Sequence, residues 1–80
     1  MEREWQAKIN RACKFFVDDF ASKANFKVTR LVFARMVPYY GHETSIYECI
    51  VQGDIATPYG SQTEMITITG NTENGVYEYR

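Results

Sequence analysis

Hydrophobic positions in the first part of the chain recur with the period of an α-helix. From residue 2 to about residue 24, apolar side chains share one arc when successive residues are placed about 100° apart. The arc consists of Trp5, Ile9, Ala12, Cys13, Phe16, Val17, Phe20 and Ala24. Charged residues occupy the opposite arc. The pattern predicts an amphipathic helix over 2–24, with Asn25 as its stop signal.

The rest of the chain has the alternating pattern of β-strands, divided by turn signals. The predicted strands are 27–37, 45–55, 62–69 and 76–79. Loops of roughly six residues separate them, and such short loops favour hairpins over crossover connections. The sequence therefore predicts a single α+β domain over 1–80, an N-terminal amphipathic helix packed on one face of a four-stranded antiparallel meander sheet.

The period of two assigns the strand residues to two faces of this sheet. The face expected to receive the helix carries Leu31, Phe33, Val37, Tyr47, Cys49, Val51, Ile55, Ile66, Ile68, Tyr77 and Tyr79. The second face carries Val32, Ala34, Met36, Ile46, Ile50, Met65 and Val76 among polar residues. One helix covers one face only, so we expect the second face to form an apolar patch that binds a partner, most simply a second copy in a homodimer. Alternatively, strand curling and the stems of Arg30 and Gln52 cover the patch in a monomer.

Composition places the chain among globular proteins. Its hydrophobic content of 45% is too high for a disordered segment. No apolar run approaches the ~18 residues of a membrane span, and the first residues lack the apolar core of a signal peptide. We expect a cytoplasmic protein that does not contact the membrane.

Cys13 and Cys49 each lie among apolar neighbours. Buried, reduced thiols are the expected state, with a disulfide or a metal pair as the alternatives. His42 is the single histidine, which argues against a Cys/His zinc site. We therefore expect no metal and no cofactor.

No catalytic motif is apparent. The chain has no Gly-rich phosphate loop, no nucleophile-elbow serine and no carboxylate pair at a diagnostic spacing. His42 stands beside Glu43, but an exposed loop histidine is the simpler interpretation. The expectation is a protein that is not an enzyme.

Charge is distributed unevenly along the chain. Residues 1–37 carry eight Lys or Arg against four Asp or Glu, whereas residues 38–80 carry one Arg against six acids. Pairing between neighbouring strands would neutralise this asymmetry. The alternative is a basic surface for nucleic acid, built from Lys8, Arg11, Lys14, Lys27, Arg30 and Arg35 and interleaved with aromatic residues.

Two groups of aromatic residues are candidates for contact with a partner. Phe15 lies off the apolar arc, one helical turn from Arg11, which is the profile of an interface anchor unless a loop or the Arg11 side chain covers the ring. Tyr39, Tyr40 and His42 lie in one loop, where they either pack over Trp5 or form an aromatic tip.

These features predict a small non-enzymatic module that binds or inhibits another protein. In size it resembles the inhibitors that phages and mobile elements use against host or defence enzymes, such as anti-CRISPR proteins. The element order is similar to cystatin-like folds, but none of their inhibitory loop residues is matched. A small nucleic-acid-binding regulator is the alternative. The predicted partner-binding residues are Phe15, Arg11, Tyr39, Tyr40, His42, Val32, Met36, Ile50 and Met65.

Overall fold

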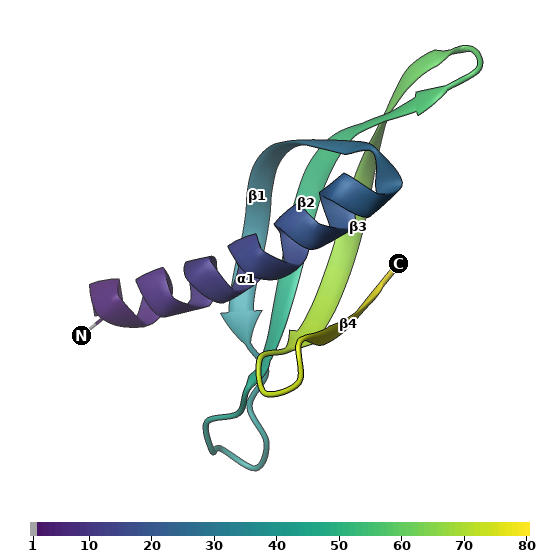
Figure 1. The fold of residues 1–80 in the computed structure, drawn as a ribbon. Coiled ribbons are helices and arrows are strands. Elements are labelled where there is room, and N and C mark those ends of the chain that lie inside the picture. Colours follow the sequence, from purple (N-terminus) through teal and green to yellow (C-terminus); the bar gives the residue numbers. More distant parts are fainter. Residues whose placement is uncertain (1) are drawn as a thin grey trace.

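A computed structural model describes residues 2–80, with side chains from Trp5 onward. Helix α1 (Glu2–Ala24) precedes strands β1 (Phe26–Met36), β2 (Ile46–Thr57), β3 (Gly60–Asn71) and β4 (Val76–Tyr79). The strands form one antiparallel sheet in the order β1-β2-β3-β4, and α1 lies across one of its faces (Figure 1). The predicted α+β meander is confirmed.

The turn from α1 into β1 occurs at Asn25, as predicted. Asn25 has a φ of 53°, the left-handed conformation that commonly ends a helix. The chain then reverses, and the buried ring of Phe26 packs 5.6 Å from the ring of Phe20. Packing on both sides of Asn25 therefore fixes the angle between the helix and the sheet.

The core lies between α1 and the sheet. Its fully buried side chains are Phe16, Ile68, Val51, Cys13 and Cys49. Gly70 of β3 makes room for Phe16, because a Cβ atom there would lie 2.6 Å from the ring. Ile9, Phe16 and Phe20 are buried as predicted, whereas the prediction for Trp5 is wrong, since this residue is 36% exposed.

Two irregularities in β1 change which residues face α1. The register with β2 shifts between Val28 and Arg30 and again between Leu31 and Phe33. Each shift is a β-bulge that leaves one extra residue unpaired, so the alternation of faces is interrupted. The period of two, which assumes an unbroken strand, therefore assigns part of β1 to the wrong face.

The outcome for individual β1 residues follows from these bulges. Phe33 pairs with Ile50 on the face away from α1, although we predicted it beneath the helix. Ala34 and Met36, which we predicted on the second face, pack against the core instead. Val32 falls within the second bulge, and Leu31 remains substantially exposed.

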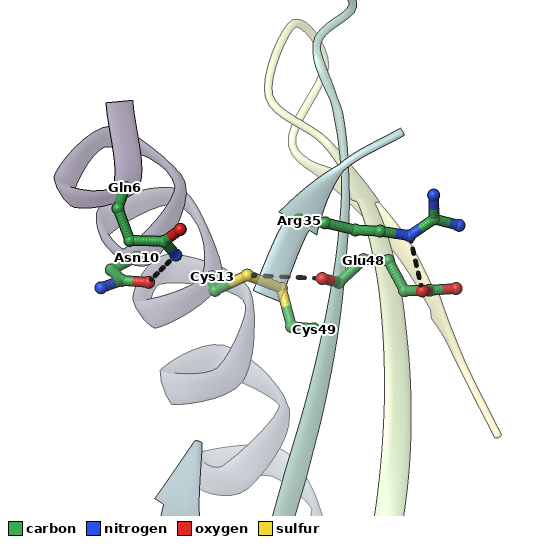
Figure 2. The surroundings of a disulfide bond; sticks show 6 residues. All are labelled: Gln6, Asn10, Cys13, Arg35, Glu48 and Cys49. Carbon is green, nitrogen blue, oxygen red and sulfur yellow. Dashed lines mark hydrogen bonds and ion pairs between the residues drawn. A yellow bond between two sulfur atoms is a disulfide. The ribbon is translucent and has the colours of Figure 1, made fainter. Parts of the chain in front are cut away.

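A disulfide joins Cys13 of α1 to Cys49 of β2 (Figure 2). Both cysteines are fully buried, as predicted, but the prediction of reduced thiols is wrong. Their Cα atoms lie 5.7 Å apart, within the range of about 4.4–6.8 Å that a disulfide requires. Sequence separation could not reveal this distance, because it results from the packing of α1 on the central part of the sheet.

The molecule is elongated, with principal extents of 46 × 24 × 18 Å. The hairpin of β2 and β3 continues past the region that α1 covers and ends in a tight turn between Thr57 and Gly60 (Figure 1). The loops between β1 and β2 and between β3 and β4 lie at the opposite end. Within residues 2–80, no helix is long and apolar enough to cross a membrane.

Candidate protein-binding site

The loop between β1 and β2 contains a tight turn over residues 39–42, which we call the tyrosine turn. The His42 N–H donates to the Tyr39 carbonyl at 2.9 Å, and the Tyr39 N–H donates to the His42 carbonyl at 3.2 Å. Tyr40 and Gly41 have φ values of 49° and 77°. Positive φ at both central positions is the geometry of a type I′ turn, which is uncommon for tyrosine and requires local support.

Thr44 supplies that support at the base of the loop. Its hydroxyl donates to the Val37 carbonyl and accepts the Ile46 N–H at 3.2 Å. The Thr44 N–H in turn lies 3.3 Å from the sulfur of Met36. Met36 therefore anchors this loop and packs against the core, so its predicted place in an exposed partner-binding patch is wrong.

The tyrosine turn presents two aromatic rings to solvent. Tyr40 is 84% exposed, Tyr39 and His42 are also exposed, and the two tyrosine rings meet edge to face with centroids 4.5 Å apart. The turn projects beyond the end of the sheet, apart from the start of α1 (Figure 1). Both tyrosine rings are largely uncovered, which favours the aromatic tip over packing on Trp5 among the two interpretations of the sequence.

Phe15 and Arg11 belong to α1 rather than to the tyrosine turn. Phe15 is 62% exposed, and the edge of its ring meets Phe16 at a centroid distance of 5.5 Å. Arg11 is exposed one helical turn away. The predicted site residues on the helix and on the loop thus form two separate surfaces.

The outer face, the side of the sheet away from α1, carries an apolar patch that differs in composition from the one predicted. Phe33 lies opposite Ile50, and Met65 occupies the next row, opposite Gln52. Phe33 is 47% exposed and Met65 54%. Met36 is absent from this face, and Phe33, which the alternation pattern placed elsewhere, takes part in the patch.

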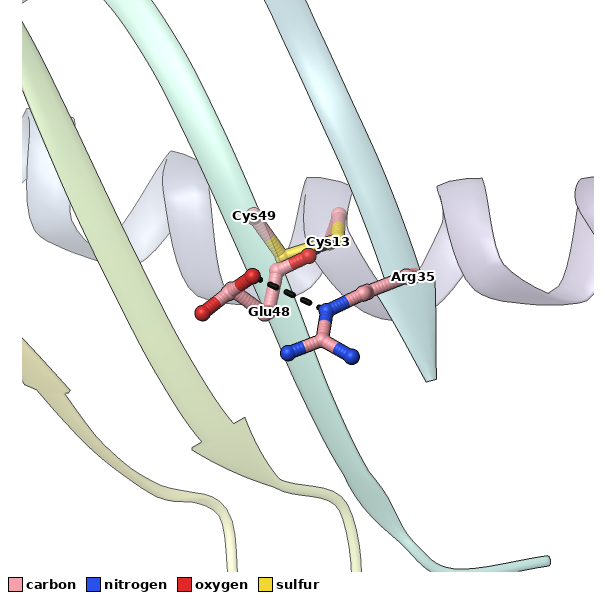
Figure 3. Close-up of polar contacts among 4 residues, drawn as sticks. All are labelled: Cys13, Arg35, Glu48 and Cys49. Atoms are coloured by element: carbon pink, nitrogen blue, oxygen red, sulfur yellow. Dashed lines mark hydrogen bonds and ion pairs between the residues drawn. A yellow bond between two sulfur atoms is a disulfide. The ribbon is translucent and has the colours of Figure 1, made fainter. Parts of the chain in front are cut away.

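Polar pairs surround this patch on the outer face. The Arg30 Nε donates to Gln52 Oε1 at 3.0 Å, and the Arg35 Nε donates to Glu48 Oε1 at the same distance. Figure 3 shows the Arg35–Glu48 ion pair on one side of β2 and the disulfide of Cys49 on the other. Glu48 and Cys49, which are consecutive in β2, therefore point to opposite faces of the sheet. Glu48 belongs to the ion pair on the outer face, and Cys49 to the disulfide on the helix side.

Most basic residues of the described chain are divided between α1 and β1. Lys14 and Lys23 form ion pairs with Asp18 and Asp19 on α1. Arg35 pairs with Glu48 on the opposite side of the sheet. Of these three ion pairs, only Arg35–Glu48 is the predicted pairing between neighbouring strands, whereas the other two neutralise charge within α1.

Tyr77 of β4 is joined to α1 through a polar contact. Its hydroxyl donates to Asp19 Oδ2 at 2.6 Å. This hydrogen bond raises the pKa of Tyr77 to about 12, and together with Lys23 it lowers the pKa of Asp19. Both groups are engaged with each other near neutral pH, so we interpret the pair as a structural link between α1 and β4. Among the side chains that the structure describes, no three His, Cys, Asp or Glu residues form a cluster suited to a metal ion.

Tyr59 is an exposed aromatic residue that the sequence analysis did not select. It is 99% exposed at the turn between β2 and β3, where its N–H donates to the Thr57 hydroxyl at 3.2 Å. Its neighbours Pro58 and Gly60 indicate a turn. A tyrosine at such a tip is a further contact candidate, at the opposite end from the tyrosine turn.

Comparison of this chain with protein-family models, with curated proteins and with solved structures finds no match.

Proposed function

We propose that this chain is a non-enzymatic module that binds another protein through the tyrosine turn. The observation that carries the proposal is the display of two exposed tyrosines on a turn that is hydrogen-bonded within itself and anchored by Thr44. Tyrosine offers a large contact area and a hydrogen-bonding hydroxyl at a small entropic cost. A turn that is already ordered reduces the cost of binding further.

The distribution of charge supports a protein partner over nucleic acid. Binding to a phosphate backbone relies on Lys and Arg that track it together. Here Lys14 and Arg35 lie on opposite sides of the sheet, and each is paired with an acid. A nucleic-acid regulator is therefore the second proposal, with a steep loss of binding at higher salt as its signature.

The experiment compares partner capture by three purified proteins in extracts of the source cells, followed by binding measurements with the captured protein. Relative to the wild type, Tyr39→Ser combined with Tyr40→Ser should weaken binding at least tenfold, as expected when central aromatic anchors are lost. Tyr59→Ser is the matched control, because it removes an equally exposed tyrosine from the opposite end. Equal binding by the double variant and the wild type would contradict the proposal.

Inhibition of an enzyme is the narrower role that we propose for this binding. Its support is the length of the chain, which is similar to that of phage and mobile-element inhibitors of host or defence enzymes, including anti-CRISPR proteins. Adding the chain to the captured enzyme should lower its activity at equimolar ratio, and an enzyme that retains full activity in the complex would restrict the role to binding.

The disulfide bears on where the module works. The expected cytoplasmic location rests on the absence of an apolar span and of a signal-peptide core, and the bond between Cys13 and Cys49 argues against it, because the cytosol keeps most thiols reduced. We propose that the chain works where this bond persists. Alkylation of free thiols at the moment of cell lysis tests this, because labelling of both cysteines would show that the bond is reduced in the cell.

A further inference from the structure

The two outer edges of the sheet differ in how far they are protected from pairing. On β1, the edge is interrupted by two bulges and carries Lys27, Arg30 and Arg35. Bulges and positive charges are devices that prevent a sheet edge from pairing with another chain. On the other side, β4 pairs only with residues 68–71 of β3. Within residues 2–80, no strand covers the remaining edge of β3, residues 60–66.

This free edge of β3 is regular. Its register with β2 runs without a bulge from Asn71 to Gly60. Thr67 exchanges backbone hydrogen bonds of 2.8 and 3.0 Å with Arg80, so its N–H and C=O point toward the β4 side. Backbone direction alternates along a strand. The N–H and C=O groups of Ser61, Thr63 and Met65 therefore point the same way, toward the free edge.

We propose that a second copy of this chain pairs with this edge, antiparallel and about a two-fold axis at Thr63. The axis places Thr63 opposite Thr63 of the second copy, and Ser61 opposite Met65 of the second copy. All of these residues direct their backbone groups to the shared edge, and each such pair exchanges two hydrogen bonds. The sheet then becomes continuous across both copies.

The side chains select this register. With the axis at Thr63, Gln62 faces Glu64 of the second copy, and paired threonines stabilise a sheet. With the axis at Glu64, the two Glu64 carboxylates would oppose each other. The strand residues Ser61 and Gly60 would then face Thr67 and Ile68, which already pair with Arg80 and Tyr79. With the axis at Thr63, the strand ends at Gly60 opposite the unpaired edge of Ile66. By the same reasoning, two β1 edges paired about Leu31 would oppose Lys27 with Arg35, which is unfavourable.

The proposed pairing also accounts for exposed side chains near the edge. Met65, which is more than half exposed, gains a neighbouring strand on the outer face. Gly60 of the second copy lies opposite Ile66, so the turn of that copy that carries Tyr59 ends next to Arg80, which pairs with Thr67. Tyr59, the most exposed aromatic side chain among those described, thereby gains a cation as a neighbour.

Disulfide trapping tests the register directly. Residues in a hydrogen-bonded antiparallel pair have Cα atoms about 5.5 Å apart, which suits a disulfide. Thr63→Cys should therefore form a crosslinked dimer under mild oxidation, in which peptide mass mapping finds the two introduced thiols joined to each other. Ser61→Cys is the matched control, because its counterpart in the second copy lies several residues away. Equal crosslinking of both variants, or none of Thr63→Cys, would overturn the register.

Sedimentation at concentrations up to about 100 μM tests the association itself. Thr63→Pro removes an N–H that the single chain does not use, so it should fold normally and yet associate at least tenfold more weakly. Thr63→Val keeps the N–H and should associate like the wild type. Ile50→Lys on the outer face should also leave the dimer intact.

A monomeric wild type, or a dimer lost in Ile50→Lys but kept in Thr63→Pro, would overturn the proposal. Neither result bears on partner binding by the tyrosine turn, which lies at the other end.

Discussion

The two faces of the sheet are built from the same strands but are stabilised differently. Under α1, an uninterrupted apolar core surrounds the Cys13–Cys49 disulfide, with Phe16 seated on Gly70. On the outer face, Phe33 and Met65 remain about half exposed beside pairs such as Arg35–Glu48. This small domain therefore concentrates its stability on one face, which leaves the other face tolerant of change.

The largest expected effect is on the helix side. Phe16→Ala should lower the free energy of unfolding by about 3–5 kcal/mol, because it empties a fully buried site between α1 and the sheet. Phe15→Ala is the matched control. It removes the adjacent, mostly exposed ring and should cost no more than about 0.5 kcal/mol. Chemical denaturation measures both, and equal losses would show that the helix faces are assigned wrongly.

Loss of the disulfide should have the next largest effect. The bond closes a loop between cysteines 36 positions apart, and the chain-entropy estimate for such a loop is about 4 kcal/mol. Reductant should therefore lower the Tm of the wild type strongly. In Cys13→Ala combined with Cys49→Ala, reductant should change nothing. Thiol labelling of the wild type should require reductant as well as denaturant, and rapid labelling in denaturant alone would contradict the bond.

A smaller effect is expected at the polar margin of the helix side. Tyr77→Phe removes the hydrogen bond to Asp19 and should lower the Tm near neutral pH. Because the pKa of Asp19 is lowered, its contribution is complete above about pH 4 and is lost as pH falls through the folded pKa. The pKa of Tyr77 is raised to about 12 in the folded protein. Its contribution to stability is therefore complete below about pH 10, the unfolded pKa, and is lost as pH rises through the folded pKa.

The Tm difference between the wild type and Tyr77→Phe should therefore be greatest between about pH 4 and about pH 10, and should shrink at lower and at higher pH. Asp19→Asn keeps an acceptor for the hydroxyl but cannot titrate, so the acidic part of this dependence should disappear. A Tm difference that is constant across pH would show that the two groups are not coupled.

The smallest expected effect lies on the outer face. Arg35→Ala should cost about 0.2–1 kcal/mol, because its ion pair with Glu48 is partly exposed and is screened by solvent and salt. Raising the salt concentration should reduce the difference from the wild type. A loss comparable to that of Phe16→Ala would mean that the outer face is not the tolerant side.

The contrast between β3 and β1 shows what sequence periodicity can predict. Along β3 the register is unbroken, and Ile66 and Ile68 face α1 as the alternation indicates. Along β1, two bulges break the alternation, so Phe33 and Met36 exchange the predicted faces. A bulge depends on pairing with the neighbouring strand, and the β1 sequence alone carried no signal for it.

Local periodicity and turn residues specify the helix, the strands, their order and most of the buried helical side chains, so these features can be predicted from the sequence. The disulfide, the composition of the outer face, the display of the tyrosine turn and the free edge of β3 arise only from the packing of the folded chain. Each of these depends on the distance or register between segments that are remote in the chain. Local patterns of hydrophobicity contain no measure of either.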